Sequence, residues 1–246
     1  MRFYGLSDIG LVRKINQDSF CATYNLNNDF IAIVCDGIGG GKAGDVASLM
    51  GCESMRNAFL KNPSLNNDDE VKQWLSEAIQ STNDLIFSQS SSVKAQNGMG
   101  TTMVGLLVNK HHSYIFNIGD SRAYAIYEDL ICLTEDHNLL HDLIKAGELS
   151  ENQAKTHPQR NVLTNALGIW NDVKVDIARI KDDYSQLLIC SDGLHGYVSE
   201  ELLKKILLSE LSMKEKAKTL IQASLNAGGF DNVTAILIDK LECEVL

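Results

Sequence analysis

Residues 30–37 read Phe30-Ile31-Ala32-Ile33-Val34-Cys35-Asp36-Gly37, an apolar run that ends in an Asp-Gly pair. The same ending recurs at residues 187–193, which read Leu187-Leu188-Ile189-Cys190-Ser191-Asp192-Gly193. Short apolar runs that are rich in β-branched residues and bounded by glycine are typical of buried strands. The sequence therefore predicts at least two buried strands, each with a carboxylate at its end.

Two more aspartates stand beside apolar runs. Asp120 follows residues 114–118, and Asp231 precedes residues 233–238. Carboxylates at the mouths of buried strands repel one another and lose hydration, so they stay ionised only when a positive charge compensates them. A cluster of divalent cations is the simplest compensation, because oxygen-only ligands suit Mg²⁺ or Mn²⁺.

Composition and charge restrict the possible classes of protein. The chain has 246 residues, 44% of them hydrophobic and only two of them proline, which fits one domain with a sizeable core. The formal net charge of −10 argues against nucleic acid as a partner. An acidic balance fits a cation-binding site, but it is equally typical of acidic proteins without one.

Cysteine usage and hydropathy predict the compartment. The six cysteines form no C-x-x-C pair, and three of them lie within apolar runs, which favours a reducing compartment over disulfides or a zinc site. The N-terminus lacks the hydrophobic region of a signal peptide, and no apolar stretch approaches the ~20 residues needed to span a membrane. We expect a cytoplasmic protein without membrane insertion.

The periodicity of apolar residues predicts an order of strands, two helices, strands, two helices and a last strand. This order favours a two-sheet core covered by helices over an alternating βαβ layout. The serines at 90–92 are expected in a surface loop, and the polar segment at about 136–165 is interpreted as a lid. The predicted strands are 3–7, 19–24, 30–35, 101–108, 113–118, 123–126, 174–180, 186–190 and 233–238, and the main helices are 44–60, 70–88, 200–209 and 214–226.

Eight ordered segments carry a resemblance to a known family. A single Asp-Gly pair would mean little, because this dipeptide is common in turns. Together the segments resemble the metal-dependent (type 2C, PPM) protein serine/threonine phosphatases, in particular the short stand-alone enzymes of Gram-positive bacteria. They are Ser7-Asp8-Ile9-Gly10 with Arg13 and Asn16-Gln17-Asp18, Asp36-Gly37-Ile38-Gly39-Gly40, Gly98-Met99-Gly100-Thr101-Thr102, Gly119-Asp120-Ser121-Arg122, Leu133-Thr134-Glu135-Asp136-His137, residues 161–168, Ser191-Asp192-Gly193, and Asp231-Asn232-Val233-Thr234.

The resemblance implies a fold, an activity and partners. It implies an α+β fold, a four-layer α/β/β/α sandwich of two antiparallel sheets flanked by helices, with residues 1–246 as a single phosphatase domain. The implied activity is hydrolysis of phosphothreonine and phosphoserine on proteins by water activated at two or three Mn²⁺ or Mg²⁺ ions. The implied partners are phosphoproteins, namely a membrane-anchored serine/threonine kinase and its substrates. We expect a monomer.

The resemblance also assigns the metal ligands. Asp36 would bridge two ions, with the Gly37 carbonyl completing one site, while Asp192 and Asp231 would hold the second ion. Asp120, together with Asp192, would hold a third and weaker ion. Taken singly, each aspartate could equally be a turn or cap residue. Their joint occurrence in these motifs favours the metal centre.

Two further residues receive roles from the family pattern. Asp18 would hydrogen-bond a metal-bound water, and with Asp36 it forms the predicted catalytic pair. Arg13 would grip two phosphate oxygens with its guanidinium, although in isolation it also fits a solvated arginine. His137 matches the pattern and is expected to make a structural hydrogen bond rather than to act in catalysis.

The chain departs from the pattern at two glycine-flanked positions. Eukaryotic members carry a histidine directly after the Asp-Gly pair, where this chain has Ile38. Many bacterial members carry one after the paired glycines, where this chain has Gly41. The general acid is therefore unassigned, although no metal ligand is lost.

Two rival functions follow from the same residues. One is a catalytically weak, metal-binding phosphatase-like module that senses a partner, against which the intact ligand aspartates argue. The other is a calcium-dependent structural protein. That class needs locally clustered ligands of the D-x-D-x-D-G kind, whereas these aspartates are spread from Asp36 to Asp231.

Overall fold

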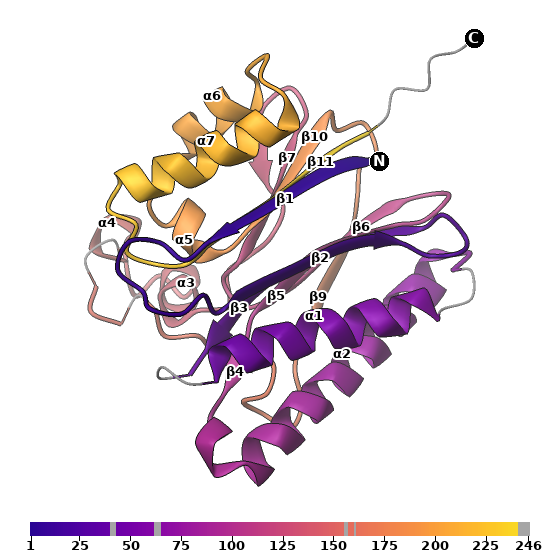
Figure 1. Cartoon of the computed structure of the whole chain (residues 1–246), viewed down its shortest axis with the longest axis vertical. Coiled ribbons are helices and arrows are strands. Elements are labelled where there is room, and N and C mark those ends of the chain that lie inside the picture. Colours follow the sequence, from indigo (N-terminus) through magenta and orange to yellow (C-terminus); the bar gives the residue numbers. More distant parts are fainter. Residues whose placement is uncertain (40–42, 62–64, 155–156, 160, 241–246) are drawn as a thin grey trace.

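The computed structural model in Figure 1 has four layers, with two sheets packed face to face between two groups of helices. It describes residues 1–246 except 40–42, 62–64, 155–156, 160 and 241–246, and for residues 151–152 the backbone alone. The predicted α+β sandwich of two antiparallel sheets flanked by helices is confirmed. Gly41 and Cys243, considered in the sequence, lie outside the described residues.

The two sheets differ in strand order, and every strand pair within them is antiparallel. The five-stranded sheet has the order β1 (Arg2–Asp8), β11 (Val233–Asp239), β10 (Gln186–Cys190), β7 (Arg122–Ile126) and β8 (Leu130–Cys132). The six-stranded sheet has the order β2 (Asp18–Tyr24), β3 (Phe30–Ile38), β5 (Met103–Val108), β6 (Ser113–Ile118) and β9 (Asp176–Ile180), and the short β4 (Gly100–Thr101) pairs with the end of β3.

Helices cover the outer face of each sheet (Figure 1). The six-stranded sheet carries α1 (Gly44–Leu60) and α2 (Asp68–Ser92), followed by a 3₁₀ turn, η1 (Lys94–Gln96). The five-stranded sheet carries α5 (Asp192–His195), α6 (Glu200–Leu207) and α7 (Met213–Asn226). Two short helices, α3 (Leu139–Lys145) and α4 (Glu151–Ala154), lie in the connection between β8 and β9. No helix of the described residues is long and apolar enough to cross a membrane.

The apolar run of β3, from Phe30 to Cys35, results from burial on both faces of the strand. Its residues alternate between two cores, because successive side chains of a strand point to opposite faces. Ile31, Ile33 and Cys35 pack with α1 and α2, while Phe30 and Val34 pack against the other sheet. A strand buried on both faces needs an unbroken apolar run rather than an alternating one.

Segments 90–92 and 101–108 differ from the prediction, and the sequence did not predict β8 or α5. Helix α2 continues through Ser92, so the surface loop expected at 90–92 is wrong. Ser90 is buried, and its hydroxyl accepts a hydrogen bond from the Gly98 amide, which offsets the low helix propensity of serine. The single strand expected at 101–108 is divided into two at Thr102. The Thr102 amide donates a hydrogen bond to the Asp36 carbonyl at 2.8 Å.

Phe59 tests how strongly the outer core contributes to stability. Its side chain is fully buried between α1 and α2, with its ring 6.1 Å from that of Trp74. We expect Phe59→Ala to lower the free energy of unfolding by about 3–5 kcal/mol, because it leaves a cavity in a packed core. Equilibrium unfolding in urea measures this. Leu49→Ala on the exposed face of α1 is the matched control, with an expected change within ~0.5 kcal/mol; equal losses would contradict the packing.

Candidate active site

Five aspartates converge at the seam between the two sheets. Asp18 and Asp36 lie opposite each other on the paired strands β2 and β3 of the six-stranded sheet. Asp192 begins α5 directly after β10, and Asp231 stands just before β11, so both come from the five-stranded sheet. Asp120 lies in the turn from β6 to β7, where the chain passes from one sheet to the other.

The predicted ligands share one cavity. A pocket of about 260 Å³ is lined by Arg13, Asp36, Gly37, Asp120, Asp192 and Asp231, among others. Asp18 lies behind it, 8% exposed. The structure therefore brings together all the residues that the sequence placed in a metal and phosphate site, although they are as much as 218 positions apart.

Burial makes these carboxylates hard to ionise without a compensating charge. Loss of hydration is the main cause that raises the pKa of Asp18 to about 7, of Asp120 to about 8 and of Asp192 to about 6. It also raises the pKa of Asp36 well above its usual value. Mutual repulsion adds to the effect, for example from Asp192 on Asp120 and from Asp231 on Asp192.

Some of these oxygens lack any donor. The Oδ1 atoms of Asp18 and Asp192 are buried without a hydrogen-bond partner in the part of the chain that the structure describes. Asp18 Oδ2, in contrast, accepts a hydrogen bond from the Ser191 hydroxyl at 2.7 Å. An unpaired buried carboxylate oxygen is costly, so this donor set fits a cation.

This set of oxygen ligands fits an ion that keeps part of its hydration shell. Within the described residues there is no group of three or more His, Cys, Asp or Glu side chains that could hold an ion by itself. Mg²⁺ usually binds proteins through one or two carboxylates and retains several waters, whereas structural Zn²⁺ requires a closed protein shell. The carboxylates and the Gly37 carbonyl match the first kind of ion.

The end of β3 is fixed by close backbone packing. A Cβ on Gly37 would lie 2.0 Å from the Gly44 carbonyl oxygen, so only glycine allows β3 to meet the start of α1 at this point. Thr101 donates its hydroxyl to the Asp36 carbonyl at 2.9 Å, and the Asp36 amide donates to Thr102 Oγ1 at 3.0 Å. These contacts hold the Asp36 backbone on both sides.

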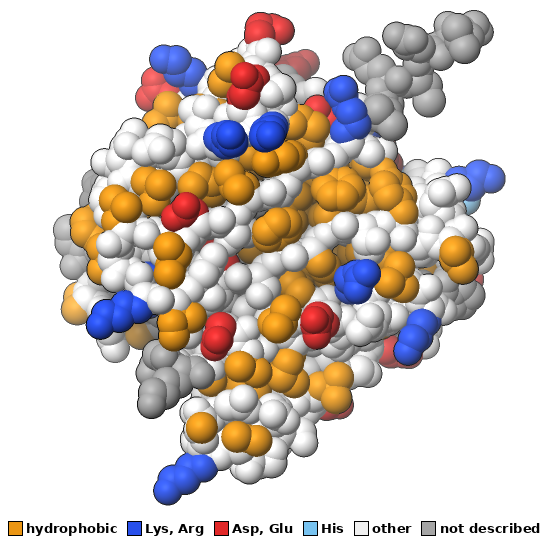
Figure 2. Space-filling view, viewed as in Figure 1, with side chains coloured by type: hydrophobic (Ala, Val, Ile, Leu, Met, Phe, Trp, Pro, Cys, Tyr) orange, Lys and Arg blue, Asp and Glu red, His pale blue; other side chains and the backbone are white. Residues whose placement is uncertain are grey.

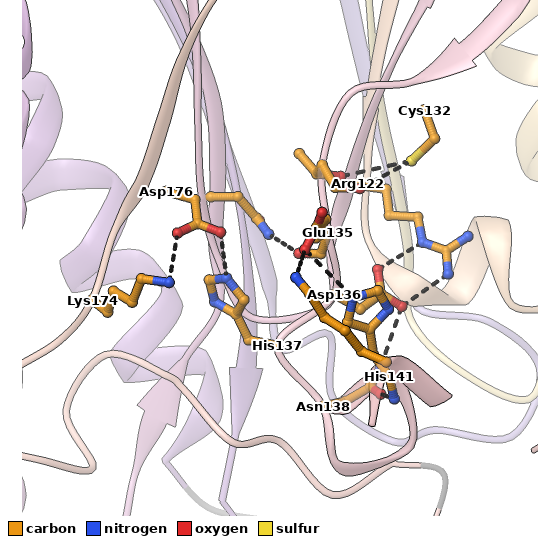
Figure 3. A network of polar contacts seen from close by, with 12 residues as sticks. Arg122, Cys132, Glu135, Asp136, His137, Asn138, His141, Lys174 and Asp176 are labelled. Atoms are coloured by element: carbon orange, nitrogen blue, oxygen red, sulfur yellow. Dashed lines mark hydrogen bonds and ion pairs between the residues drawn. The ribbon is translucent and has the colours of Figure 1, made fainter. Parts of the chain in front are cut away.

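A polar network supports the turn that carries Asp120 (Figure 3). Asp136 accepts two hydrogen bonds of 2.8 Å from Arg122 on β7, and the next residue, His137, bonds Asp176 on β9 at 3.0 Å. The His137 amide donates to the Gly119 carbonyl, and the Gly119 amide donates to His137 Nδ1. His137 therefore makes the structural hydrogen bonds expected of it, with its proton on Nε2.

His195 also holds this turn, which the sequence did not indicate. Its Nε2 lies 2.9 Å from the Asp120 carbonyl oxygen, which can only accept, so Nε2 carries the proton. Burial, and then the Arg122 charge, lowers the pKa of His195 to about 4, so the ring is neutral at pH 7. The carbonyl of the predicted ligand Asp120 is thereby fixed by a neutral donor from α5.

Arg13 stands at the mouth of the cavity on the β1–β2 loop. Its Nη2 donates to Asp231 Oδ2 at 2.8 Å, and its side chain remains 47% exposed. Asn232, whose role the sequence did not reveal, holds this loop: Nδ2 donates to the carbonyls of Ile9 and Ile15 at 2.9 and 3.0 Å. Its Oδ1 accepts from the Gln17 amide.

Comparison with known families decides the identity of this arrangement. Residues 12–228 match the family model described as protein phosphatase 2C. The chain belongs to this family. The segment matched includes the Arg13 loop, β3 with Asp36 and α5 with Asp192, but it ends before Asp231.

Relatives of this phosphatase come from several bacteria. It is 39% identical over 236 residues to the serine/threonine phosphatase Stp of Listeria monocytogenes, covering 95% of this chain and 94% of that one. It is 33% identical over 241 residues to the protein phosphatase PhpP of Streptococcus pneumoniae, covering 96% of each. The crystal structure of Stp1 from Staphylococcus aureus superposes with a TM-score of 0.92 at 33% identity, covering 97% of this chain and 94% of that one.

The family, the fold and the class of activity predicted from the sequence are thus confirmed: the chain is a phosphatase of the serine/threonine-specific type 2C family, and hence a hydrolase. The rival interpretation as a catalytically weak sensing module is not favoured. The individual roles of Arg13, Asp18, Asp36 and the other ligands stay predictions.

The buried carboxylates predict how the stability of the cation-free phosphatase depends on pH. Their pKa values are raised on folding, so between about pH 4 and pH 8 the folded state holds protons that the unfolded chain has lost. The free energy of unfolding in a chelator should therefore fall as pH rises through this window. Asp192→Asn should reduce the fall by more than about 1 kcal/mol between pH 5 and pH 8.

Urea unfolding at the two pH values measures this dependence. Asp172→Asn changes an exposed aspartate outside the cavity and should keep the wild-type fall in stability. Mn²⁺ should restore stability more strongly at pH 8 than at pH 5, because it replaces protons on the same oxygens. A wild-type stability that is constant or rises over this range would contradict the assignment of the raised pKa values.

Proposed function

We propose that this phosphatase releases phosphate from phosphothreonine and phosphoserine of proteins, using Mn²⁺ or Mg²⁺ ions held by the carboxylate cluster. The observation that carries the proposal is the convergence of buried carboxylates with unpaired oxygens at the floor of a cavity whose mouth carries Arg13. The names of the relatives, which are serine/threonine phosphatases, support the substrate class.

The chain offers a ligand set for two ions and a weaker third. Asp36 and the Gly37 carbonyl would hold one ion, Asp36 with Asp192 and Asp231 would hold the second, and Asp120 with Asp192 would hold the third. Bound ions supply positive charge that neutralises phosphate oxygens and acidifies an attacking water. The orphaned oxygens of this cluster are the feature that supports such binding.

Side chains around the carboxylate cluster would accept the proton of the water and bind the phosphate. Ser191 bonds Asp18 at Oδ2 and so leaves Oδ1 as the acceptor for a water proton. Arg13 can turn from Asp231 to the phosphate, because its side chain is half-exposed and its ion pair with Asp231 lies at the cavity mouth. Its planar guanidinium can then grip two phosphate oxygens and orient phosphorus toward the attacking water.

The segment at about 136–165 is proposed to act as the lid of a single domain that spans residues 1–246. Its two ends are joined, since the Leu139 amide donates to the Val162 carbonyl at 2.8 Å and Asn138 bridges to Leu163. Asn161 and Leu163 line the catalytic cavity, which supports a contact between this segment and a bound phosphoresidue.

The proposed setting of the enzyme follows from the family resemblance. Its counterpart would be a membrane-anchored serine/threonine kinase, whose output on shared phosphoprotein substrates this phosphatase reverses. We propose a cytoplasmic monomer. The free thiols of Cys21, Cys35, Cys52, Cys132 and Cys190 are consistent with a reducing compartment.

Phosphate release from a phosphothreonine peptide under Mn²⁺ titration is the first test. We expect turnover that rises with Mn²⁺, disappears with a chelator and falls about a hundredfold or more in Asp192→Ala, because a ligand of the charge-neutralising ions is lost. Asp172→Ala is the matched control and should retain wild-type turnover. Full activity of Asp192→Ala, or activity that survives the chelator, would overturn the metal mechanism.

Arg13→Ala tests the phosphate grip separately from the metal. The variant should raise KM for phosphopeptide about tenfold or more, the typical cost of losing a charge-assisted bidentate contact, while Mn²⁺ affinity changes far less. Isothermal titration with Mn²⁺ and steady-state kinetics separate the two effects. Arg2→Ala, which removes the exposed arginine paired with Asp239, is the control. An unchanged KM would remove Arg13 from the phosphate site.

A further inference from the structure

Three large apolar side chains beside the mouth of the catalytic cavity are more than half exposed. Leu11 and Val12 on the β1–β2 loop are 69% and 59% exposed, and Phe230 is 53% exposed. We call these three residues the apolar rim. Figure 2 shows hydrophobic side chains on the left of the face in view, where Figure 1 places this loop. Isolated exposed leucines are ordinary, but grouped ones beside a functional site mark an interaction surface.

The apolar rim adjoins the groups that would hold the phosphate. Val12 directly precedes Arg13, and Phe230 directly precedes Asp231, so each rim residue lies on the same short segment as one member of the Arg13–Asp231 ion pair. A polypeptide whose phosphate reaches Arg13 therefore comes close to these two segments. Successive residues of an extended chain advance about 3.3 Å, so the neighbours within three positions can reach the rim.

The backbone beneath the apolar rim is firmly held. The Leu11 amide donates to the Gly229 carbonyl at 2.7 Å, and Asn232 fixes both ends of the loop through Ile9 and Ile15. Gly10 has a φ of +80°, and a Cβ there would lie 2.3 Å from the Asp231 carbonyl oxygen. The loop therefore rests on the segment before β11, and the backbone that carries its apolar side chains is held in one path before substrate binds.

The rim continues toward a second cavity. Phe230 packs beside Tyr197, with ring centroids 5.8 Å apart. Tyr197 lines a pocket of about 630 Å³ that shares Asp120 and Asp192 with the catalytic cavity. An apolar side chain that settles on Phe230 would thus lie on a surface continuous with the phosphate site.

We propose that Leu11, Val12 and Phe230 determine substrate specificity by receiving an apolar side chain of the phosphoprotein within three residues of the phosphorylated one. This inference rests on the proposed function, since it requires a phosphoprotein in the cavity. The preferred substrates are then phosphothreonine or phosphoserine segments with a neighbouring leucine-like residue, rather than segments that are polar on both sides.

A set of phosphothreonine peptides tests the proposal. In a Gly/Ser background, a single leucine occupies each position from three residues before to three residues after the phosphothreonine. For the wild type, kcat/KM at one or more positions should exceed that of the leucine-free peptide about fivefold, as expected from partial burial of one apolar side chain. The double variant Leu11→Ser/Phe230→Ser and the single variant Val12→Ser should each lose this gain in kcat/KM.

Turnover of p-nitrophenyl phosphate provides the internal reference, because it carries no peptide. The readout is the ratio of kcat/KM for the leucine peptide to that for p-nitrophenyl phosphate, which should fall about fivefold in the rim variants. Leu26→Ser is the matched control, since Leu26 is 97% exposed in the turn between β2 and β3 and should keep the wild-type ratio. Thermal unfolding of each variant establishes that the loop remains folded.

Three outcomes would overturn the proposal. The first is a wild type that treats all the peptides alike, and the second is a set of rim variants that keep the gain from leucine. The third is a wild-type dimer in sedimentation that dissociates in the rim variants, which would make the rim a contact between two copies. If the wild type cleaves p-nitrophenyl phosphate but no phosphopeptide, the proposed function itself fails, and this differs from all three.

Discussion

The burial of like charges at the seam of two sheets is the constraint on which the rest of this structure depends. Asp18 and Asp36 come from one sheet, Asp192 and Asp231 from the other, and Asp120 from the turn between them. Repulsion and lost hydration would drive these groups apart if they stood on loose loops. They are held because each lies within or next to a strand whose apolar residues are packed into a core.

Hydrogen bonds around the cluster also join the two sheets. Ser191, at the end of β10, bonds Asp18 on β2 and accepts from the Thr234 amide on β11. His195 and Asn232 likewise reach the β6–β7 turn and the β1–β2 loop from elements distant in sequence. The active site and the packing of the sandwich are therefore parts of one arrangement, and neither sheet alone contains the ligand set.

Local sequence patterns predicted those features of the fold that depend on residues close together in the chain. The helix at 44–60 was predicted with its observed bounds, because apolar residues recur there at helical spacing and glycine marks its start. The loop expected at 90–92 was wrong, because the buried partner of Ser90 comes from a later turn. The roles of His195 and Asn232 were missed for the same reason: their partners lie 75 and more than 200 positions away, and no local spacing encodes such contacts.

Asn232 has a consequence for how members of such a lineage can diverge. Its side chain contacts the β1–β2 loop through main-chain groups, namely the carbonyls of Ile9 and Ile15 and the amide of Gln17, and these contacts do not depend on which side chains the loop displays. Mutations at positions 11 and 12 can accumulate while the loop keeps its path and the arginine beside them keeps its place. Under the specificity role proposed for the apolar rim, substitutions there would change which phosphoproteins are preferred, one surface residue at a time, while the backbone beside Arg13 keeps its path.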